Sequence, residues 1–362
     1  MAGTTELREA LYGTLTTYQK WLEAEGLDVI KGVFVDDLRT VLLKPWKRKG
    51  AMGVYINLEG AGDSDDAYVC EIPAGGTLNS EKHLFEELVF ILSGRGATEI
   101  WNEGGRKQTF EWQEGSLFAV PLNAWHRHCN RREDQPTRYL AVTGAPTVMD
   151  LFHSIDFVFN CDYTFTDRYD GEQDYFSGEG TFYPDERVAE INFIPDVKSF
   201  QMFDCQERGA GSTNVMFELA NNIMAAHISE FPATSYKKAH RHGPGAHVVI
   251  LSGKGYTLMW KEGEQKQRFD WHEGSMIVPP DRWFHQHFNT GKEPARYLGL
   301  RTVGSSLKFH TGRQFAAHSD RLYDSFKLGG DLIEYEDEDP KVRELFVAEL
   351  AKEGLQMQNA SS

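Results

Sequence analysis

The sequence lacks any long hydrophobic run. No stretch of the 362 residues approaches the ~20 consecutive apolar residues that a helix needs to cross a bilayer. The N-terminus, MAGTTELREALYG, also lacks the apolar centre of a secretory signal. We therefore expect no membrane span and predict a cytoplasmic protein.

Cysteine and positive charge are also scarce. The four cysteines are far apart and form no CxxC pair, which predicts reduced, structural thiols. The formal net charge is -16, because 54 acidic residues outnumber 38 basic ones, so the basic surface that nucleic-acid binding requires is missing. No serine or cysteine stands in the context of a catalytic triad, and no glycine pair stands in a strand-to-helix phosphate loop.

What the chain does contain is a long internal repeat. Residues 89–130 contain VFILSGRG, IWNEGG, FEWQEGS and HRHCN, and residues 248–289 contain VVILSGKG, MWKEGE, FDWHEGS and HQHFN. One offset relates every matching pair, such as His126 and His285, so no insertion or deletion interrupts the unit. The chain therefore carries the same fold twice.

The repeat lies within two segments that are typical of β-structure. Short apolar or alternating runs, separated by Gly, Pro and Asn, fill about residues 36–145 and 213–305 and predict an antiparallel sandwich or barrel in each. Between them, residues 151–205 are acidic, aromatic and without clear periodicity, and we expect this connector to pack on the barrels. We predict an N-terminal domain over residues 1–150 and a C-terminal domain over residues 206–362.

A helix is expected at each end of the chain. The first has apolar residues at spacings of four and three and stops at Gly26; its apolar residues are Leu7, Leu11, Leu15, Tyr18 and Leu22. The second starts at Asp339-Pro340, an N-cap followed by proline at the first helical position. Its apolar face consists of Val342, Leu345, Phe346 and Leu350.

Histidines distinguish the two copies of the repeat. His240 and His242 precede the second copy and are one residue apart, so in a strand they project to the same side. His285 and His287 repeat this spacing on a later strand, and a barrel can bring the two strands together. Three imidazoles leave coordination positions open for a substrate and for water or dioxygen, an arrangement that suits Fe(II), Mn(II) or Zn(II).

These residues resemble the metal motifs of the cupin superfamily, and in particular of the two-domain bicupins. The second cupin motif (Gly, Pro, His, Asn) fits twice, as Gly115, Pro121, His126 and Asn130 and as Gly274, Pro280, His285 and Asn289. The resemblance implies an all-β fold of two cupin barrels (double-stranded β-helix, or jelly-roll), with an N-terminal and a C-terminal helix. It implies that His285, rather than His287, is the third ligand beside His240 and His242, and it implies a homo-oligomer.

The second copy resembles one branch of these proteins more closely. Ala246 stands where most cupins have a glutamate ligand, and AHRHGPGAHVVILSGKGY is similar to the metal motif of gentisate 1,2-dioxygenase and its salicylate and hydroxynaphthoate relatives. This resemblance implies Fe(II) on three histidines and cleavage of an aromatic ring with dioxygen. The arginine that helps those enzymes to hold the substrate carboxylate falls on Val248 here. Arg282 is a candidate replacement, and Trp283 is a candidate wall of the substrate pocket.

We therefore expect a metal-dependent dioxygenase, an oxidoreductase that acts on a small phenolic or anionic substrate. Fe(II) is expected at His240, His242 and His285, with His287 as a proton donor or acceptor. The first alternative is a non-redox lyase, isomerase or decarboxylase that uses Mn(II), Zn(II) or Ni(II) at the same residues. The second is a bicupin that binds a metal or a ligand without turnover.

The first copy leaves two interpretations open. It retains His83, Glu87 and His126 and has Glu81 in place of the first histidine. Two histidines and a carboxylate suffice for a divalent ion, with Glu81 as a further ligand, so a second metal site is one interpretation. The other is a decayed site in which His83 and Glu87 form a buried hydrogen-bonded pair.

Overall fold

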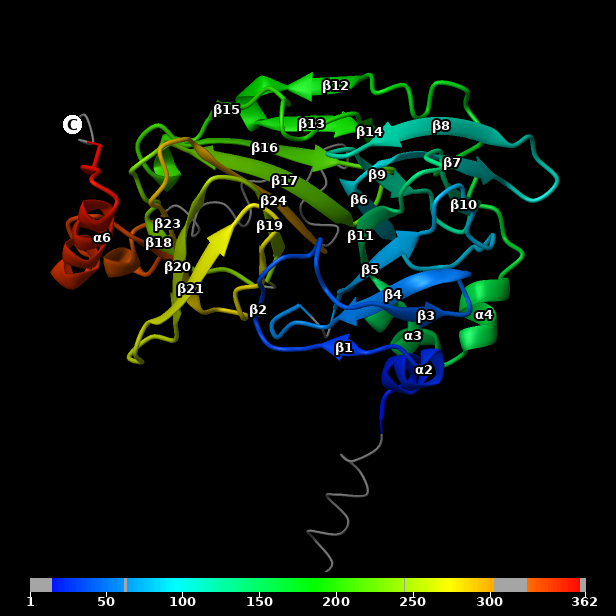
Figure 1. Cartoon of the computed structure of the whole chain (residues 1–362), viewed down its shortest axis with the longest axis horizontal. Helices are drawn as coiled ribbons and strands as arrows, with labels where there is room; N and C mark the ends of the chain where they lie inside the picture. The colour runs from blue at the N-terminus through cyan, green and yellow to red at the C-terminus, as the bar shows by residue number, and fades with distance from the viewer. Residues whose placement is uncertain (1–14, 62–63, 244, 303–323, 359–362) are drawn as a thin grey trace, which may run out of the picture.

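The chain folds into two β-barrels that lie side by side. The computed structural model describes residues 15–61, 64–243, 245–302 and 324–358 (Figure 1). In Figure 1 the blue and cyan N-terminal barrel lies on the right and the yellow and orange C-terminal barrel on the left, with α6 at the outer end of the latter. The predicted all-β fold with a helix near each end is confirmed.

The N-terminal barrel consists of a large sheet and a small one. Within the described residues the large sheet has the order β1-β4-β5-β11-β6-β9-β14, with β3 paired to β4, and the small sheet has the order β10-β7-β8. The strands of the barrel are β1 Val29–Ile30, β3 Lys44–Trp46, β4 Ala51–Ile56, β5 Asp66–Ile72, β6 Glu87–Ser93, β7 Arg95–Trp101, β8 Gln108–Gln113, β9 Leu117–Val120, β10 Trp125–Asn130, β11 Thr137–Thr143 and β14 Phe193–Ile194.

The C-terminal barrel repeats this arrangement. Its large sheet has the order β12-β13-β16-β17-β24-β19-β22-β2, with β15 paired to β16, and its small sheet has the order β21-β20-β23-β18-β25. The strands are β2 Phe34–Val35, β12 Gly180–Tyr183, β13 Val188–Ile191, β15 Phe203–Asp204, β16 Thr213–Glu218, β17 Met224–Phe231, β18 Ala239–His240, β19 His247–Ser252, β20 Lys254–Trp260, β21 Gln267–His272, β22 Met276–Ile277, β23 Phe284–Asn289, β24 Ala295–Thr302 and β25 Leu332–Ile333.

The two barrels exchange edge strands. β2, from the N-terminal segment, pairs with β22 of the C-terminal barrel, and β14, from the connector, pairs with β9 of the N-terminal barrel. One apolar core lies between the two large sheets and includes Leu140 from the first barrel and Leu298 from the second, both fully buried. Each barrel therefore depends on the other to cover the outer face of its large sheet.

The connector packs on the barrels, as its aromatic composition predicts. The Phe176 ring stacks on Phe110 of β8 with 4.0 Å between centroids, and the Arg168 guanidinium donates to the Glu86 carboxylate over 2.8 Å. The connector also holds short regular elements that its sequence did not indicate. Besides β12 to β15 these are α4 Ile155–Asn160, which follows α3 Ala145–Phe152, and the single turn η1 Pro184–Glu186; a second turn, η2 Gln206–Arg208, follows the connector.

The N-terminal helix ends at the predicted glycine but begins later than predicted, because Leu15 lies before its N-cap and is 40% exposed. α2 (Thr17–Glu25) begins with a capping box between Thr16 and Gln19 and ends at Gly26, whose φ is 70°. The predicted residues Leu7 and Leu11 lie outside the described part of the chain. A turn, η5 (Phe326–Leu328), precedes the last helix.

The C-terminal helix begins at its predicted boundary. In α6 (Pro340–Lys352) the side chain of Asp339 caps the N-terminus by accepting from the Lys341 amide. Gly354, with a φ of 67°, follows its end. The buried face of α6 packs beside the small sheet of the C-terminal barrel and consists of Val342, Phe346 and Leu350.

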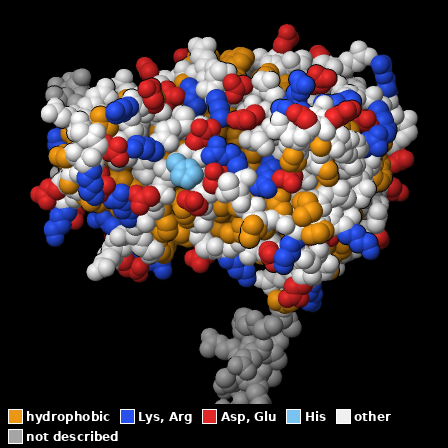
Figure 2. Space-filling model, in the orientation of Figure 1, with side chains coloured by type: hydrophobic (Ala, Val, Ile, Leu, Met, Phe, Trp, Pro, Cys, Tyr) orange, Lys and Arg blue, Asp and Glu red, His pale blue; other side chains and the backbone are white. Residues whose placement is uncertain are grey.

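The described surface shows neither a membrane helix nor a basic patch on the face in view. Among the described helices none has both the length and the apolar character that crossing a bilayer requires. Acidic and basic side chains alternate over the face in Figure 2, with small groups of hydrophobic side chains between them.

Candidate metal centre

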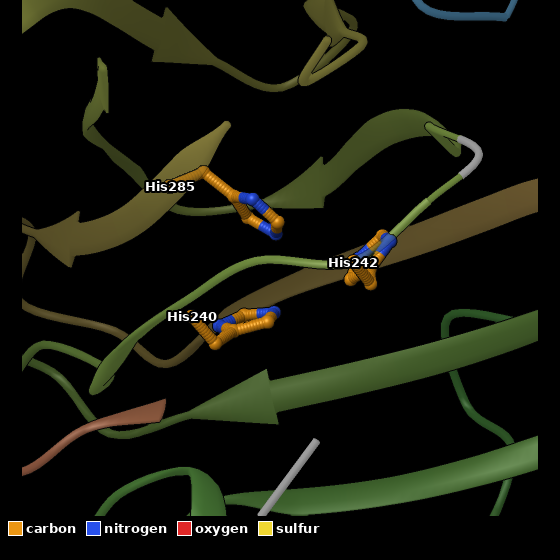
Figure 3. A group of neighbouring side chains, drawn as sticks. All are labelled: His240, His242 and His285. Carbon is orange, nitrogen blue, oxygen red and sulfur yellow. The ribbon is translucent and has the colours of Figure 1, made fainter. Parts of the chain in front are cut away.

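Three histidines meet inside the C-terminal barrel. His240 of β18 lies directly opposite His285 of β23 in the strand register, and His242 follows two residues after His240. Their ligand-capable atoms all lie within 4.8 Å of one another. The three rings surround a common space between the two segments (Figure 3). The structure thus brings together the three ligands predicted from the repeat.

The hydrogen bonds of these rings suit metal binding. The Nδ1 atoms of His240 and His285 each lie 3.3 Å from a backbone carbonyl, of Lys238 and Trp283 respectively. A carbonyl accepts from an N–H, so each bond places the ring proton on Nδ1 and leaves the Nε2 lone pair for an ion. The donor set fits a divalent transition metal with open coordination positions.

The environment keeps these histidines neutral. Burial, together with the positive charges of Arg208 and Arg301, lowers the pKa of His285 to about 3. Burial and the same two guanidinium groups hold the pKa of His242 well below 6.5. Burial and Arg208 do the same for His240. A ring that stays neutral offers its lone pair without first losing a proton.

Metal affinity is therefore expected to be nearly constant between pH 7 and pH 5. Protons compete with the ion only as the pH approaches the lowered pKa of the folded site, which for His285 is about 3. Unperturbed imidazoles, with a pKa of about 6.5, would already lose affinity below pH 6.5. Titration of the metal-free protein with Co(II) at pH 7, 6 and 5 measures this, and a hundredfold loss of affinity over that range would contradict it.

His287 belongs to an arrangement that both barrels share. Its Nδ1 lies 2.7 Å from the Thr257 hydroxyl, which also accepts from the Trp271 indole over 3.0 Å. In the N-terminal barrel His128, Thr98 and Trp112 form the same three-residue chain, with distances of 2.7 and 2.9 Å. Because both barrels have these hydrogen bonds, the threonine and the tryptophan position the histidine in each of them. The bonds therefore do not distinguish His287 from His128, and the proton-transfer role of His287 remains a proposal.

A buried lysine lies near His287 in the same barrel. Lys237 is 1% exposed, and its ammonium donates to the hydroxyl groups of Ser229 and, over 3.1 Å, Tyr297. The Tyr297 ring is 5.2 Å from the ring of His287. The positive charge of Lys237 also contributes to the lowered pKa of His287, for which burial is the largest cause. Lys237 lies outside the histidine and glycine motifs of the sequence.

Matched positions show how the interior of the C-terminal barrel differs from that of the N-terminal barrel. With the offset of the repeat, Lys237 corresponds to Leu78. His240 corresponds to Glu81 and Ala246 to Glu87 by the same offset. The C-terminal interior thus has neither of these two carboxylates and has gained an ammonium group. Apart from neighbouring histidines, the charges with the largest effect on its histidines are those of Arg208, Arg301 and Lys237.

The two predicted pocket residues lie at the outer end of this site. The Arg282 guanidinium donates to both carboxylate oxygens of Asp331, at 2.7 and 2.8 Å, and its side chain is 50% exposed. Trp283 is half-buried and has the Lys261 ammonium 5.3 Å from its ring centroid. The Arg282 guanidinium is thus occupied by its ion pair with Asp331. The cations that lower the pKa of His285 or His287 are Arg208, Arg301 and Lys237.

The N-terminal barrel brings together the residues predicted for a second site. Glu81 and His126 pair through their backbones in an isolated antiparallel β-bridge, and the ligand-capable atoms of Glu81, His83 and His126 lie within 4.8 Å of one another. The His83 Nε2 lies 2.9 Å from a carboxylate oxygen of Glu87, as in the interpretation of a buried pair. Two cations that the sequence analysis did not identify, Arg48 and Lys49, pair with Glu81.

Comparison with known proteins supports the fold. Residues 68–143 match the model of the Cupin domain. No curated protein sequence matches the chain. A single-substitution variant of oxalate decarboxylase from Bacillus subtilis superposes with a TM-score of 0.50 at 14% identity, covering 75% of this chain and 78% of that one. An oxalate decarboxylase solved to define its substrate binding mode and a switch in reaction specificity superposes with a TM-score of 0.50 at 13% identity, covering 75% and 77%.

Fold and comparisons agree on the architecture. Residues 68–143 match the Cupin domain, and the fold of two barrels in one chain is similar to that of the oxalate decarboxylases. At 13–14% identity the oxalate decarboxylases show the fold alone. The bicupin fold that the histidine and glycine motifs predict is therefore confirmed, and the reaction has to be argued from the site.

Proposed function

We propose that the chain is a metal-dependent enzyme whose C-terminal barrel binds a small carboxylate substrate at a divalent ion. The observation that carries the proposal is the meeting of His240, His242 and His285 in a barrel interior where the nearby charges with the largest effect are basic. An ion on three neutral histidines keeps its full positive charge. With Lys237, Arg208 and Arg301 acting on the same space, the interior favours an anion.

The residues around the ion would have three different roles. His240, His242 and His285 would hold the metal, which polarises substrate oxygens and, if redox-active, activates dioxygen. Lys237 would bind a carboxylate of the substrate and fix its orientation, since an ammonium–carboxylate hydrogen bond is about twice as strong as a neutral one. His287, held by Thr257, would accept or donate a proton at a substrate oxygen.

Two reaction classes are compatible with these roles of the metal ligands, Lys237 and His287. The three-histidine set without glutamate resembles that of Fe(II) ring-cleaving dioxygenases and supports oxygen-dependent cleavage of a phenolic acid. The likeness in fold to oxalate decarboxylase supports the second class, an oxygen-independent lyase or decarboxylase reaction on a small acid with Mn(II) or a similar ion.

Turnover is expected on small carboxylates and not on their uncharged analogues. The protein, loaded separately with Fe(II) and with Mn(II), is incubated with gentisate, salicylate and oxalate, and with hydroquinone and phenol as neutral controls. Because a charge-assisted contact contributes about 1.5–3 kcal/mol, the neutral analogues should lose roughly a hundredfold in kcat/KM.

Assays with and without dioxygen distinguish the two reaction classes. Oxygen uptake that matches substrate loss indicates a dioxygenase, and carbon dioxide release under argon indicates a decarboxylase. Equal turnover of neutral analogues would contradict the carboxylate proposal. Tight metal binding without turnover of any acid would support the non-catalytic alternative.

A further inference from the structure

The N-terminal barrel holds an internal ion-pair cluster where the C-terminal barrel holds its three histidines. The two carboxylate oxygens of Glu81 accept from the Lys49 ammonium and the Arg48 guanidinium, one from each. Lys49 is 3% exposed, and Arg48 is also bound to Glu25 over 2.8 Å. Both oxygens of the Glu81 carboxylate therefore accept hydrogen bonds from protein cations.

The other donors of this cluster are also engaged. His83 uses Nε2 on Glu87 and has Nδ1 2.8 Å from the carbonyl of Phe85. The remaining oxygen of Glu87 accepts from the Tyr68 hydroxyl. Among the donors named, only the His126 Nε2 has no hydrogen-bond partner, and it lies 3.7 Å from the nearest Glu81 oxygen.

Protein cations already occupy the position that an added ion would take beside Glu81. Arg48 and Lys49 both pair with Glu81, and Arg48 is shared with Glu25, so protein cations already supply the positive charge that an ion would bring to Glu81. The cavity beside Glu81, lined by Arg48, Lys49 and Glu87 among others, leaves about 10 Å³, which is room for about one water molecule. A divalent ion would have to displace the Lys49 ammonium and leave it buried without a counter-charge.

We infer that the N-terminal barrel is a latent metal site in which the Lys49 ammonium, with Arg48, takes the place of the ion. This assigns one metal to each chain and gives the N-terminal barrel a structural role. The inference is independent of the reaction proposed above, since it concerns only the barrel that carries Glu81.

Lys49→Met/Glu81→His is the variant that tests this inference. It removes the ammonium and restores the histidine that the C-terminal barrel has at the matched position, His240. Co(II) titration followed by its visible absorption is expected to give one equivalent for the wild type and two for the double variant. Lys82→Met, which removes another buried lysine near this cluster, is the matched control and is expected to remain at one equivalent.

The inference is overturned by either of two results. One is a wild type that binds two equivalents and loses one on His83→Ala substitution. The other is a folded double variant that gains no Co(II). If the double variant does not fold, the single variant His285→Ala provides the test, because it leaves the N-terminal cluster intact. The absence of bound Co(II) in this variant supports the inference. One remaining equivalent of Co(II) at the Glu81 cluster refutes it.

Discussion

His285→Ala is expected to abolish metal binding and turnover, whereas His126→Ala, its counterpart in the other barrel, leaves both in place. Among the described residues His285 is one of three imidazoles grouped closely enough to hold an ion in the C-terminal barrel, and the Ala246 position offers no carboxylate to compensate. Losing one of three ligands should weaken metal binding by at least about a hundredfold, since loss of a residue that merely supports a ligand costs 10–100-fold. Elemental analysis after dialysis and a kcat measurement at saturating substrate record the two effects.

His126→Ala is an unusually well-matched control for this experiment. The repeat places His126 and His285 at equivalent positions on β10 and β23, and both are buried, at 1% and 3% exposure. A loss of stability from cavity formation should therefore be similar for the two variants. If the metal and the activity disappear in His126→Ala and survive in His285→Ala, the assignment of the working barrel is wrong.

Lys237→Leu is expected to raise KM for a carboxylate substrate by about 10–100-fold and to leave KM for an uncharged analogue unchanged. Leucine is the residue that the N-terminal barrel has at this position, Leu78, where it is buried. A charge-assisted hydrogen bond of about 1.5–3 kcal/mol corresponds to this range. The unfolding temperature should be equal to or above that of the wild type, since an apolar group replaces a buried charge.

Lys238→Leu is the control for charge in the same segment. Lys238 is next in the chain, but its ammonium pairs with Glu334 at 2.5 Å, outside the barrel interior. The KM of this variant should stay within about twofold of the wild type, because the Lys238 ammonium is already paired with Glu334. A KM for carboxylates that is unchanged in Lys237→Leu would show that the lysine does not bind the substrate.

The sequence predicts the fold well because the repeat shows where strands and turns recur in the two barrels. Pro280, His285 and Asn289 recur at the spacing of Pro121, His126 and Asn130, and such a pattern indicates strands and turns without any long-range information. The exchanged strands β2 and β14 could not be predicted in this way. Each is two residues long and pairs with a barrel distant in sequence, so its partner depends on the shape of the assembled core.

The candidate site could be predicted in part. The HxH spacing and the matched His285 are local signals, and the structure brings these histidines together. Lys49, which precedes β4, reaches Glu81 through the fold of the barrel, and no spacing rule connects the two. Lys237 was missed although a signal existed, since aligning the two copies places an unusual lysine opposite the buried Leu78.

Anomalous X-ray diffraction from crystals of the protein grown with Co(II) tests the central claim most directly. The account predicts one strong peak per chain, within bonding distance of Nε2 of His240, His242 and His285. It predicts no peak between Glu81, His83 and His126, where the Lys49 ammonium lies. A peak in the N-terminal barrel alone, or no peak near the three histidines, would contradict it.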